Sequence, residues 1–287
     1  MITRIITVGP QRLGNLLLTL SQDHFLDPEP DNTVIITPLP ESSVTSTIAK
    51  NYPALVFTVV ADSSLIRQYP AILRWHDDRN LRGGWLMQQA LKLAAIDSVD
   101  SDVFLIQDPD TFLIDHYRYY DQGNLCHFVL PQQFHYQGYY QTLENTLGIV
   151  RQTTDSFVTE FMPVLKSDWL LCCAQIMSVV GKQWTEIIDH VPLEPFGQHH
   201  RVRWFSEYEL LGNWHRYLRP GSSIIQRRFV FNAIDTLNDL NTQYNAVCDR
   251  GIRGQVKGAP GLFSDQCEVN NTNINLVKEI LRSKKLC

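Results

Sequence analysis

Residues 1–110 alternate between short apolar runs and stretches of helical periodicity. The runs are rich in β-branched residues, as strands buried on both faces are, and they cover residues 2–8, 33–37, 54–60 and 103–106. Leucines recur at helical spacing over 10–20, and apolar residues line one face of a predicted helix over 84–95. This order predicts an α/β fold with an open, mostly parallel, Rossmann-like sheet and helices on both faces.

The second half of the chain is less regular and is rich in Tyr, His and Gln over 116–140. Its helical patterns cover 168–180, capped by Ser167 and ended by Gly181, a stretch that starts at Ser206, and finally 274–282. No repeat or linker composition interrupts the sequence. We therefore expect one domain over 1–287, with a regular half over 1–115 and an elaborated C-terminal half over 116–287.

Composition excludes several classes of protein. Hydrophobic residues make up 44% and charged residues 19%, which is typical of a globular chain. No apolar stretch approaches the roughly 20 residues of a membrane helix, and residues 1–12 do not resemble a targeting signal. The six cysteines lack CxxC or zinc-ligand spacing. These features predict a cytoplasmic protein without a membrane span and with free thiols. The net charge is −5, but the first two thirds of the chain are acidic and the last third is basic. The basic last third could face an anionic ligand.

The apolar run 103–106 leads directly into Gln107-Asp108-Pro109-Asp110. Residues i and i+2 of a strand share a face, so Asp108 and Asp110 converge, and ligands of such sheets bind where the strands end. Two converging carboxylates repel each other unless a cation neutralises them, and Mn²⁺ or Mg²⁺ suits oxygen ligands of this kind. The chemistry that uses such a site is the departure of a phosphate or diphosphate. The simpler alternative is a turn.

Residues 103–113 resemble the DxD segment of GT-A glycosyltransferases, which use nucleotide-sugar donors. Residues 83–92, 156–164 and 205–214 resemble local patterns of a bacterial and viral branch of that superfamily. The resemblance spans about 80–215, and the strand order supports it over 1–80. It implies a GT-A domain with a nucleotide-sugar-binding half over 1–115 and an acceptor-binding half over 116–287.

The resemblance also implies a donor site. Asp108 and Asp110 would hold the metal and diphosphate, with Asp110 acting in catalysis. The other implied donor-binding residues border the base, ribose, phosphates or sugar, and they are Thr7, Val8, Gly9, Asp62, Arg82, Gln88, Gln89 and Lys92. The simpler alternatives are a loop cap for Asp62 and a solvated helix face for Gln88, Gln89 and Lys92.

The sequence Ser206-Glu207-Tyr208-Glu209 has two interpretations. It fits a capping box, in which Ser206 caps a helix and Glu209 reaches back. Alternatively Glu207 is catalytic and binds the acceptor hydroxyl, as a general base in an inverting enzyme or as a stabiliser of the oxocarbenium-like centre in a retaining one. Glu209, His199, His200 and Trp214 are further acceptor-binding candidates.

A histidine from the C-terminal half completes the metal shell in many GT-A enzymes. The candidates here are His199, His200 and His215, of which we predict His215. The simpler alternative for each is a histidine with a satisfied hydrogen bond.

The sequence therefore predicts a metal-dependent hexosyl- or pentosyltransferase. We expect a uridine-linked sugar donor and a hydroxyl acceptor, such as a glycan or a hydroxylated base of modified DNA, the one case in which nucleic acid would be a partner. The alternatives are a nucleotidyltransferase, which Gly9-Pro-Gln-Arg-Leu-Gly14 fits poorly, and a non-catalytic nucleotide- or glycan-binding protein. The absence of GxxxxGK[ST], GxGxxG and GxSxG sequences disfavours the kinases, dehydrogenases and hydrolases that use them.

Overall fold

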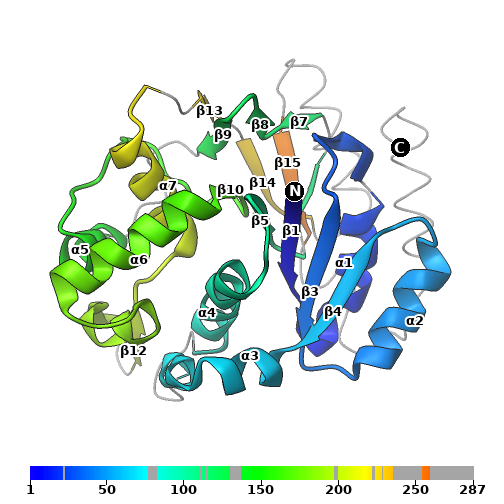
Figure 1. Ribbon diagram of the computed structural model, residues 1–287, viewed down its shortest axis with the longest axis horizontal. Coiled ribbons are helices and arrows are strands. Elements are labelled where there is room, and N and C mark those ends of the chain that lie inside the picture. The colour runs from blue at the N-terminus through cyan, green and yellow to red at the C-terminus, as the bar shows by residue number, and fades with distance from the viewer. Residues whose placement is uncertain are drawn as a thin grey trace.

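A five-stranded sheet forms the centre of the computed structural model (Figure 1). The structure describes residues 1–21, 23–76, 83–109, 111–113, 116–129, 137–196, 200–221, 224–227, 229–234 and 254–258. The sheet has the order β10-β5-β1-β3-β4, formed by Phe161–Leu165, Val103–Gln107, Ile2–Thr7, Asn32–Thr37 and Phe57–Ala61. All neighbours are parallel except β10, which is antiparallel to β5. The predicted α/β class with an open, mostly parallel sheet is confirmed.

Helices cover both faces of this sheet, as predicted (Figure 1). Successive residues of a strand point to opposite faces, and in β1 Ile6 packs with helices α1 (Leu13–Leu20) and α2 (Glu41–Asn51). Its neighbour Ile5 packs on the other face, in the core that includes α4 (Gly83–Ser98). Both isoleucines are fully buried, which stabilises the fold by about 1.5–3 kcal/mol each.

The second half adds one strand to the sheet and three helices beside it. These helices are α5 (Gln137–Leu147), α6 (Lys166–Val180) and α7 (Glu207–Leu218), and they pack into the same core as α4. Helix α7 comes very close to the loop before β10, because a Cβ added at Gly212 would lie 2.3 Å from the Phe157 ring. Only glycine fits there, so this position fixes where α7 can lie.

Short elements complete the described fold. The 3-10 helices are η1 (Pro10–Arg12), η2 (Asp23–Phe25), η3 (Pro70–Trp75) and η5 (Trp184–His190), and a short helix α3 spans Asp62–Gln68. Strands β2 (Leu26–Asp27) and β7 (Tyr117–Arg118) pair, as do β11 (Leu193–Phe196) and β12 (His200–Arg203). One three-stranded sheet has the order β13 (Ile224–Arg227), β9 (Asn124–Val129) and β8 (Tyr120–Asp121). A second has the order β14 (Phe229–Ile234), β15 (Gly254–Gly258) and β6 (Thr111–Leu113).

Some predicted boundaries differ from those observed. Helix α6 begins at Lys166 with Leu165 as its N-cap, so the Ser167 cap is wrong: β10 runs directly into the helix. Its end at Gly181 is confirmed, with φ of 72° in the left-handed region. The predicted helix over 274–282 lies outside the described residues. None of the helices in the described part of the chain has the length and apolar character needed to cross a bilayer.

Candidate active site

Four side chains meet at the carboxyl end of β5, centred on the ammonium group of Lys92. Its Nζ donates to Asp108 Oδ1, to Glu207 Oε1 at 2.8 Å and to the Tyr208 hydroxyl at 3.1 Å. The Tyr208 hydroxyl in turn donates to the same Asp108 oxygen at 2.9 Å. We call these four residues the lysine-centred cluster. It joins the end of a central strand to two helices that are far apart in sequence.

Helices α4 and α7 position the cluster. Gln89 lies almost one turn before Lys92 on α4, and its Oε1 accepts a hydrogen bond from the Glu207 backbone N–H at 2.9 Å. Ser206 is the N-cap of α7, and its hydroxyl accepts from the Glu209 N–H, as predicted. The other half of the capping box is wrong, because the Glu209 carboxylate accepts from groups other than the Ser206 N–H. The simpler alternative of a solvated helix face is therefore wrong for Gln89 and Lys92, which are buried beneath the start of α7.

The backbone at Asp108 and Pro109 is held by hydrogen bonds to the residue before β10 and to helix α1. The Asp108 N–H donates to the Glu160 carbonyl at 3.1 Å, just before β10 begins. Glu160 has φ of 64°, a left-handed conformation that is uncommon for a residue other than glycine. The Thr19 hydroxyl of α1 donates to the Pro109 carbonyl at 2.7 Å. Strained backbone of this kind is concentrated at functional sites.

Burial decides the electrostatics of the lysine-centred cluster. The side chains of Lys92 and Glu207 are 3% and 1% exposed. Burial lowers the pKa of Lys92, but the carboxylates of Asp108 and Glu207 outweigh it and leave this pKa raised. Burial raises the pKa of Glu207 against the opposing effect of Lys92. Two carboxylates face one ammonium, so the cluster formally carries one excess negative charge.

The second carboxylate oxygen of Glu207 is the polar atom without a partner in this cluster. Oε2 is buried and accepts no hydrogen bond from the described residues, while Oε1 is held by Lys92. An unpaired buried acceptor is costly, and such groups often mark a place where a ligand binds. A hydroxyl group is the simplest ligand that would satisfy it.

Among the described residues of this cluster, Asp108 is the one that a divalent ion could bind. Its side chain is 22% exposed, so a ligand can reach it from outside the lysine-centred cluster. Among the residues that the structure describes, no three His, Cys, Asp or Glu side chains lie close enough to hold an ion. Asp110 lies outside the described residues. Mg²⁺ commonly takes one or two carboxylates and completes its shell with substrate phosphates and water, which Asp108 permits.

The predicted base-binding residues follow β1. Thr7 is 2% exposed, and its hydroxyl has no hydrogen-bond partner among the described residues. The Val8 side chain packs in the core beside α1 and α2, so a base would meet backbone here and not this side chain. Gly9 lies beside open space, since an added Cβ would have no atom within 4 Å.

Two other donor candidates lie at the surface. Asp62 is the first residue of helix α3, after the N-cap Ala61, and its Oδ1 accepts from the Ser63 N–H at 2.5 Å. Gln88 is exposed on α4. Arg82 lies outside the described residues. Contacts of these residues with a donor stay predictions.

Two of the acceptor candidates are corrected by their surroundings. Glu209 is 1% exposed: one carboxylate oxygen accepts from the Ser156 hydroxyl and the Phe157 N–H, and the other from Asn213. Its role is to fasten the loop before β10 to α7, and burial raises its pKa to about 7. Trp214 is 4% exposed and donates to the Asp168 carbonyl, so it offers no platform to a sugar.

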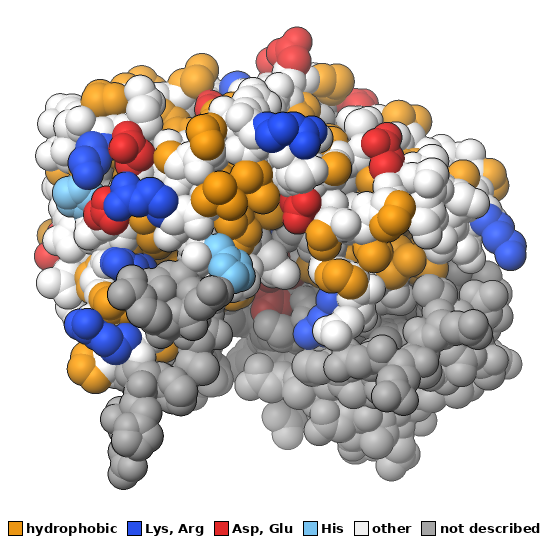
Figure 2. Space-filling model, turned by 90° about the horizontal axis from the view of Figure 1, so that it is seen from below, with side chains coloured by type: hydrophobic (Ala, Val, Ile, Leu, Met, Phe, Trp, Pro, Cys, Tyr) orange, Lys and Arg blue, Asp and Glu red, His pale blue; other side chains and the backbone are white. Residues whose placement is uncertain are grey.

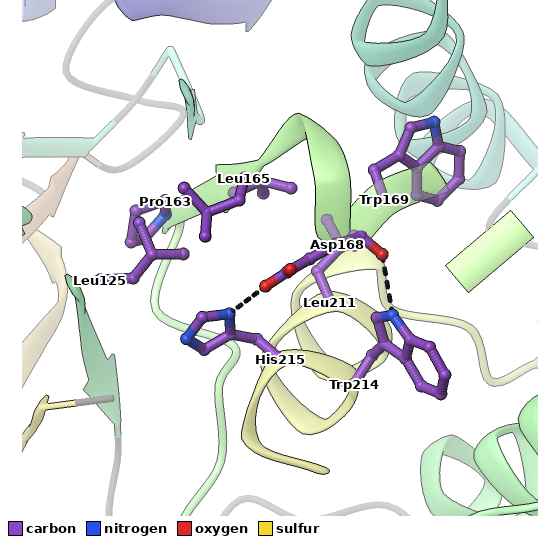
Figure 3. A pocket seen from close by; sticks show the side chains of 9 residues that line it. Leu125, Pro163, Leu165, Asp168, Trp169, Leu211, Trp214 and His215 are labelled. Carbon is purple, nitrogen blue, oxygen red and sulfur yellow. Dashed lines mark hydrogen bonds and ion pairs between the residues drawn. The ribbon is translucent and has the colours of Figure 1, made fainter. Parts of the chain in front are cut away.

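The predicted metal ligand His215 belongs to a different site. It lies two turns after Glu207 on α7, about 12 Å along the helix axis. Its Nδ1 contacts Asp168 Oδ2 at 2.6 Å (Figure 3). Arg219 Nη2 donates to the other carboxylate oxygen of Asp168, Oδ1, at 2.8 Å. The cavity beside this trio, lined by apolar residues such as Leu125 and Leu211, measures about 10 Å³, close to the space of one water. We therefore correct His215 to a structural residue.

The remaining histidine candidates cannot be placed. His199 lies outside the described residues, and only the backbone of His200, in β12, is described. Sequence analysis missed Tyr208 and Glu160, although both lie in segments quoted for the GT-A resemblance. On the face shown in Figure 2, basic, acidic and apolar side chains are interspersed, and the surface is hollowed near its centre.

Comparisons with known proteins were made for sequence and structure. Residues 11–231 match the model of a family described as a family of unknown function (DUF6492). Curated proteins give no match. Two solved structures resemble the chain. The first is the galactosyltransferase LgtC in complex with donor and acceptor sugar analogues, which is 11% identical, has a TM-score of 0.44 and covers 98% of this chain and 95% of that chain. The second is an active-site mutant of LgtC, which is 12% identical, has a TM-score of 0.45 and covers 96% of this chain and 95% of that chain. Likeness at this level carries no conclusion about activity.

Proposed function

Because the chain belongs to the DUF6492 family, whose function is unknown, we propose an activity from the site itself: a GT-A type transfer of a sugar from a nucleotide-sugar donor to a hydroxyl acceptor. One observation carries the proposal. Glu207 and Asp108 share the ammonium of Lys92 at the end of the central sheet, and Glu207 Oε2 is buried without a partner among the described residues, so an acceptor group and a donor group would be joined through Lys92.

The donor side of the proposal rests on Asp108. Ligands of open, mostly parallel sheets bind at the carboxyl ends of the strands, and Asp108 directly follows β5. A bound Mn²⁺ or Mg²⁺ would absorb the charge that develops on the leaving diphosphate. Thr7 and Gly9, at the end of the adjacent strand β1, would border the base, which we take to be uracil.

The acceptor side rests on Glu207. The unpaired Oε2 would accept a hydrogen bond from the acceptor hydroxyl, of a glycan or of a hydroxylated base in modified DNA. In transfer, the bond between the anomeric carbon and the diphosphate oxygen breaks, and the diphosphate keeps the electron pair. The acceptor oxygen forms the new bond and gives up its proton. With inversion, Glu207 takes that proton. With retention, the oxygen of the departing diphosphate takes it, and Glu207 stabilises the oxocarbenium-like centre.

Lys92 and Gln89 would orient Glu207 for this role. The ammonium of Lys92 holds Oε1, and the Gln89 amide oxygen accepts from the Glu207 N–H, so Oε2 is the oxygen that faces a substrate. A general base works best when its rotamer is fixed within hydrogen-bonding reach of the proton that it removes. Both residues act through Glu207 and are positioning residues in this account.

Asp108→Asn tests the donor site. Asparagine keeps an oxygen that accepts from Lys92 and Tyr208 but loses the charge that attracts a metal ion. We expect the Mn²⁺-dependent affinity for uridine diphosphate, measured by calorimetry, to fall roughly 100-fold or more. Asp102→Asn is the matched control, because this exposed carboxylate lies at the opposite end of β5. Unchanged binding in Asp108→Asn would remove this residue from the donor site.

A further inference from the structure

The ammonium group of Lys92 lies between the carboxylates of Asp108 and Glu207. An ammonium group has three N–H donors, and here all three are used, on Asp108, Glu207 and Tyr208. The side chain is 3% exposed, so these bonds face little competition from water. In the lysine-centred cluster, the ammonium group of Lys92 is therefore the cation that neutralises the carboxylate pair.

We propose that Lys92 competes with the divalent ion for Asp108, so that the ion enters this site only together with the donor diphosphate. The inference rests on the proposed function and deepens it by setting the order of binding. It assigns to Lys92 a role beyond contact with the donor, namely that of a built-in barrier to metal ions alone.

Charge balance supports the competition. A free divalent ion at Asp108 would come within a few ångströms of the Lys92 ammonium, and like charges at such distances repel strongly in partly buried surroundings. The ion would also draw Asp108 Oδ1 away from Lys92, leaving a buried ammonium short of one partner. The cluster carries only one excess negative charge with which to offset a gain of two positive ones.

A diphosphate changes this balance. It brings negative charge of its own and oxygen atoms that serve both the metal ion and the ammonium. Arriving as one complex, metal and diphosphate add little net positive charge to the site. Lys92 can then exchange Asp108 for a phosphate oxygen while its bond to Glu207 is kept.

Calorimetry with Mn²⁺ alone tests the competition without any measurement of activity. We expect Lys92→Met to bind Mn²⁺ alone at least about tenfold more tightly than the unaltered protein, because the competing charge is gone. Lys166→Met is the matched control. That lysine is also fully engaged, through the carbonyls of Ile96, Asp97 and Val99, and it touches no carboxylate in the described part of the chain, so its loss should leave Mn²⁺ binding unchanged.

A second variant covers the case in which Lys92→Met does not fold, since it leaves two buried carboxylates uncompensated. The double variant Lys92→Met/Glu207→Gln keeps one negative charge in the cluster. Compared with Glu207→Gln alone, it should bind Mn²⁺ alone at least about tenfold more tightly. Equal or weaker Mn²⁺ binding in the variants that lack Lys92 would overturn the inference.

The same titrations separate this inference from the proposed function. Uridine diphosphate is added in a second series with Mn²⁺ on the unaltered protein. If this series shows no binding while Lys92→Met still gains affinity for Mn²⁺ alone, the competition holds and the nucleotide-sugar donor is wrong. If nucleotide binding is present but Mn²⁺ affinity does not depend on Lys92, the proposed function stands and the competition is wrong.

Discussion

Glu207→Gln is expected to lower the rate of sugar transfer roughly 10²–10⁴-fold while leaving donor affinity unchanged. Glutamine keeps the shape of the side chain and an oxygen for Lys92, but it cannot take a proton or carry negative charge. Donor affinity is kept because Asp108, and not Glu207, faces the diphosphate in this account. Turnover with a saturating acceptor and calorimetry with uridine diphosphate measure the two quantities separately.

The control for this variant is Glu144→Gln, an exposed glutamate on α5 that should transfer at the unaltered rate. Circular dichroism checks that both variants fold. A Glu207→Gln protein with near-normal turnover would reduce Glu207 to the first residue of α7, and the acceptor side of the site would have to be sought elsewhere.

The largest effect on stability is expected at Asp168. Its side chain is buried, and the carboxylate contacts His215 Nδ1 and accepts from Arg219, so it ties the start of α6 to the end of α7. The Asp168 backbone carbonyl also accepts from Trp214, a bond that does not depend on the side chain. Asp168→Ala leaves the buried His215 without its partner, and breaking a buried pair in this way costs about 3–5 kcal/mol of unfolding free energy. Urea denaturation of both proteins at pH 7 measures the difference.

The stability lost in Asp168→Ala should also depend on pH, and the pKa of Asp168 sets the direction of that dependence. Burial raises the pKa of Asp168, but hydrogen bonds from His215 and Arg219 outweigh it and hold this pKa below its usual value of 3.8. The stabilisation is therefore fully present above about pH 4 and is lost as the pH falls through the folded-state pKa. The gap between the two proteins should shrink below pH 4.

Asp189→Ala is the matched control for Asp168→Ala. Asp189 also pairs with two basic side chains, Arg74 and Lys182, but at the surface. Surface ion pairs contribute less than about 1 kcal/mol, so this variant should unfold almost as the unaltered protein does. Equal losses at Asp168 and Asp189 would mean that the trio at α6 and α7 is not the fastening that we describe.

The strand pattern was readable from the sequence because it is local. The four predicted apolar runs correspond to four of the five strands of the central sheet, although β4 begins at Phe57 and not at residue 54, and β10 was missed. The position of Asp108 at the end of β5 followed from that pattern alone. Helix α2 was missed because it packs against the sheet through only two fully buried apolar residues, Val44 and Ile48, which give a weak periodic signal.

The site residues were harder to predict because they depend on contacts between distant segments. Periodicity identifies the apolar face of α4 and leaves Gln89 and Lys92 on its polar side, where a solvated surface is the default. The start of α7, more than a hundred residues later, covers that side and buries both. The same limit explains His215 and Trp214, whose partner Asp168 lies on α6.

A thermal-shift screen of nucleotide sugars, each with and without Mn²⁺, tests the central claim most directly. We expect a uridine-linked sugar to raise the melting temperature of the unaltered protein when Mn²⁺ is present, and Mn²⁺ alone to raise it far less. By linkage, a ligand at 100 times its Kd adds about 2.7 kcal/mol of stability, an effect that such a screen detects. Uniform melting temperatures for all nucleotide sugars, with and without Mn²⁺, would contradict the assignment of a glycosyltransferase.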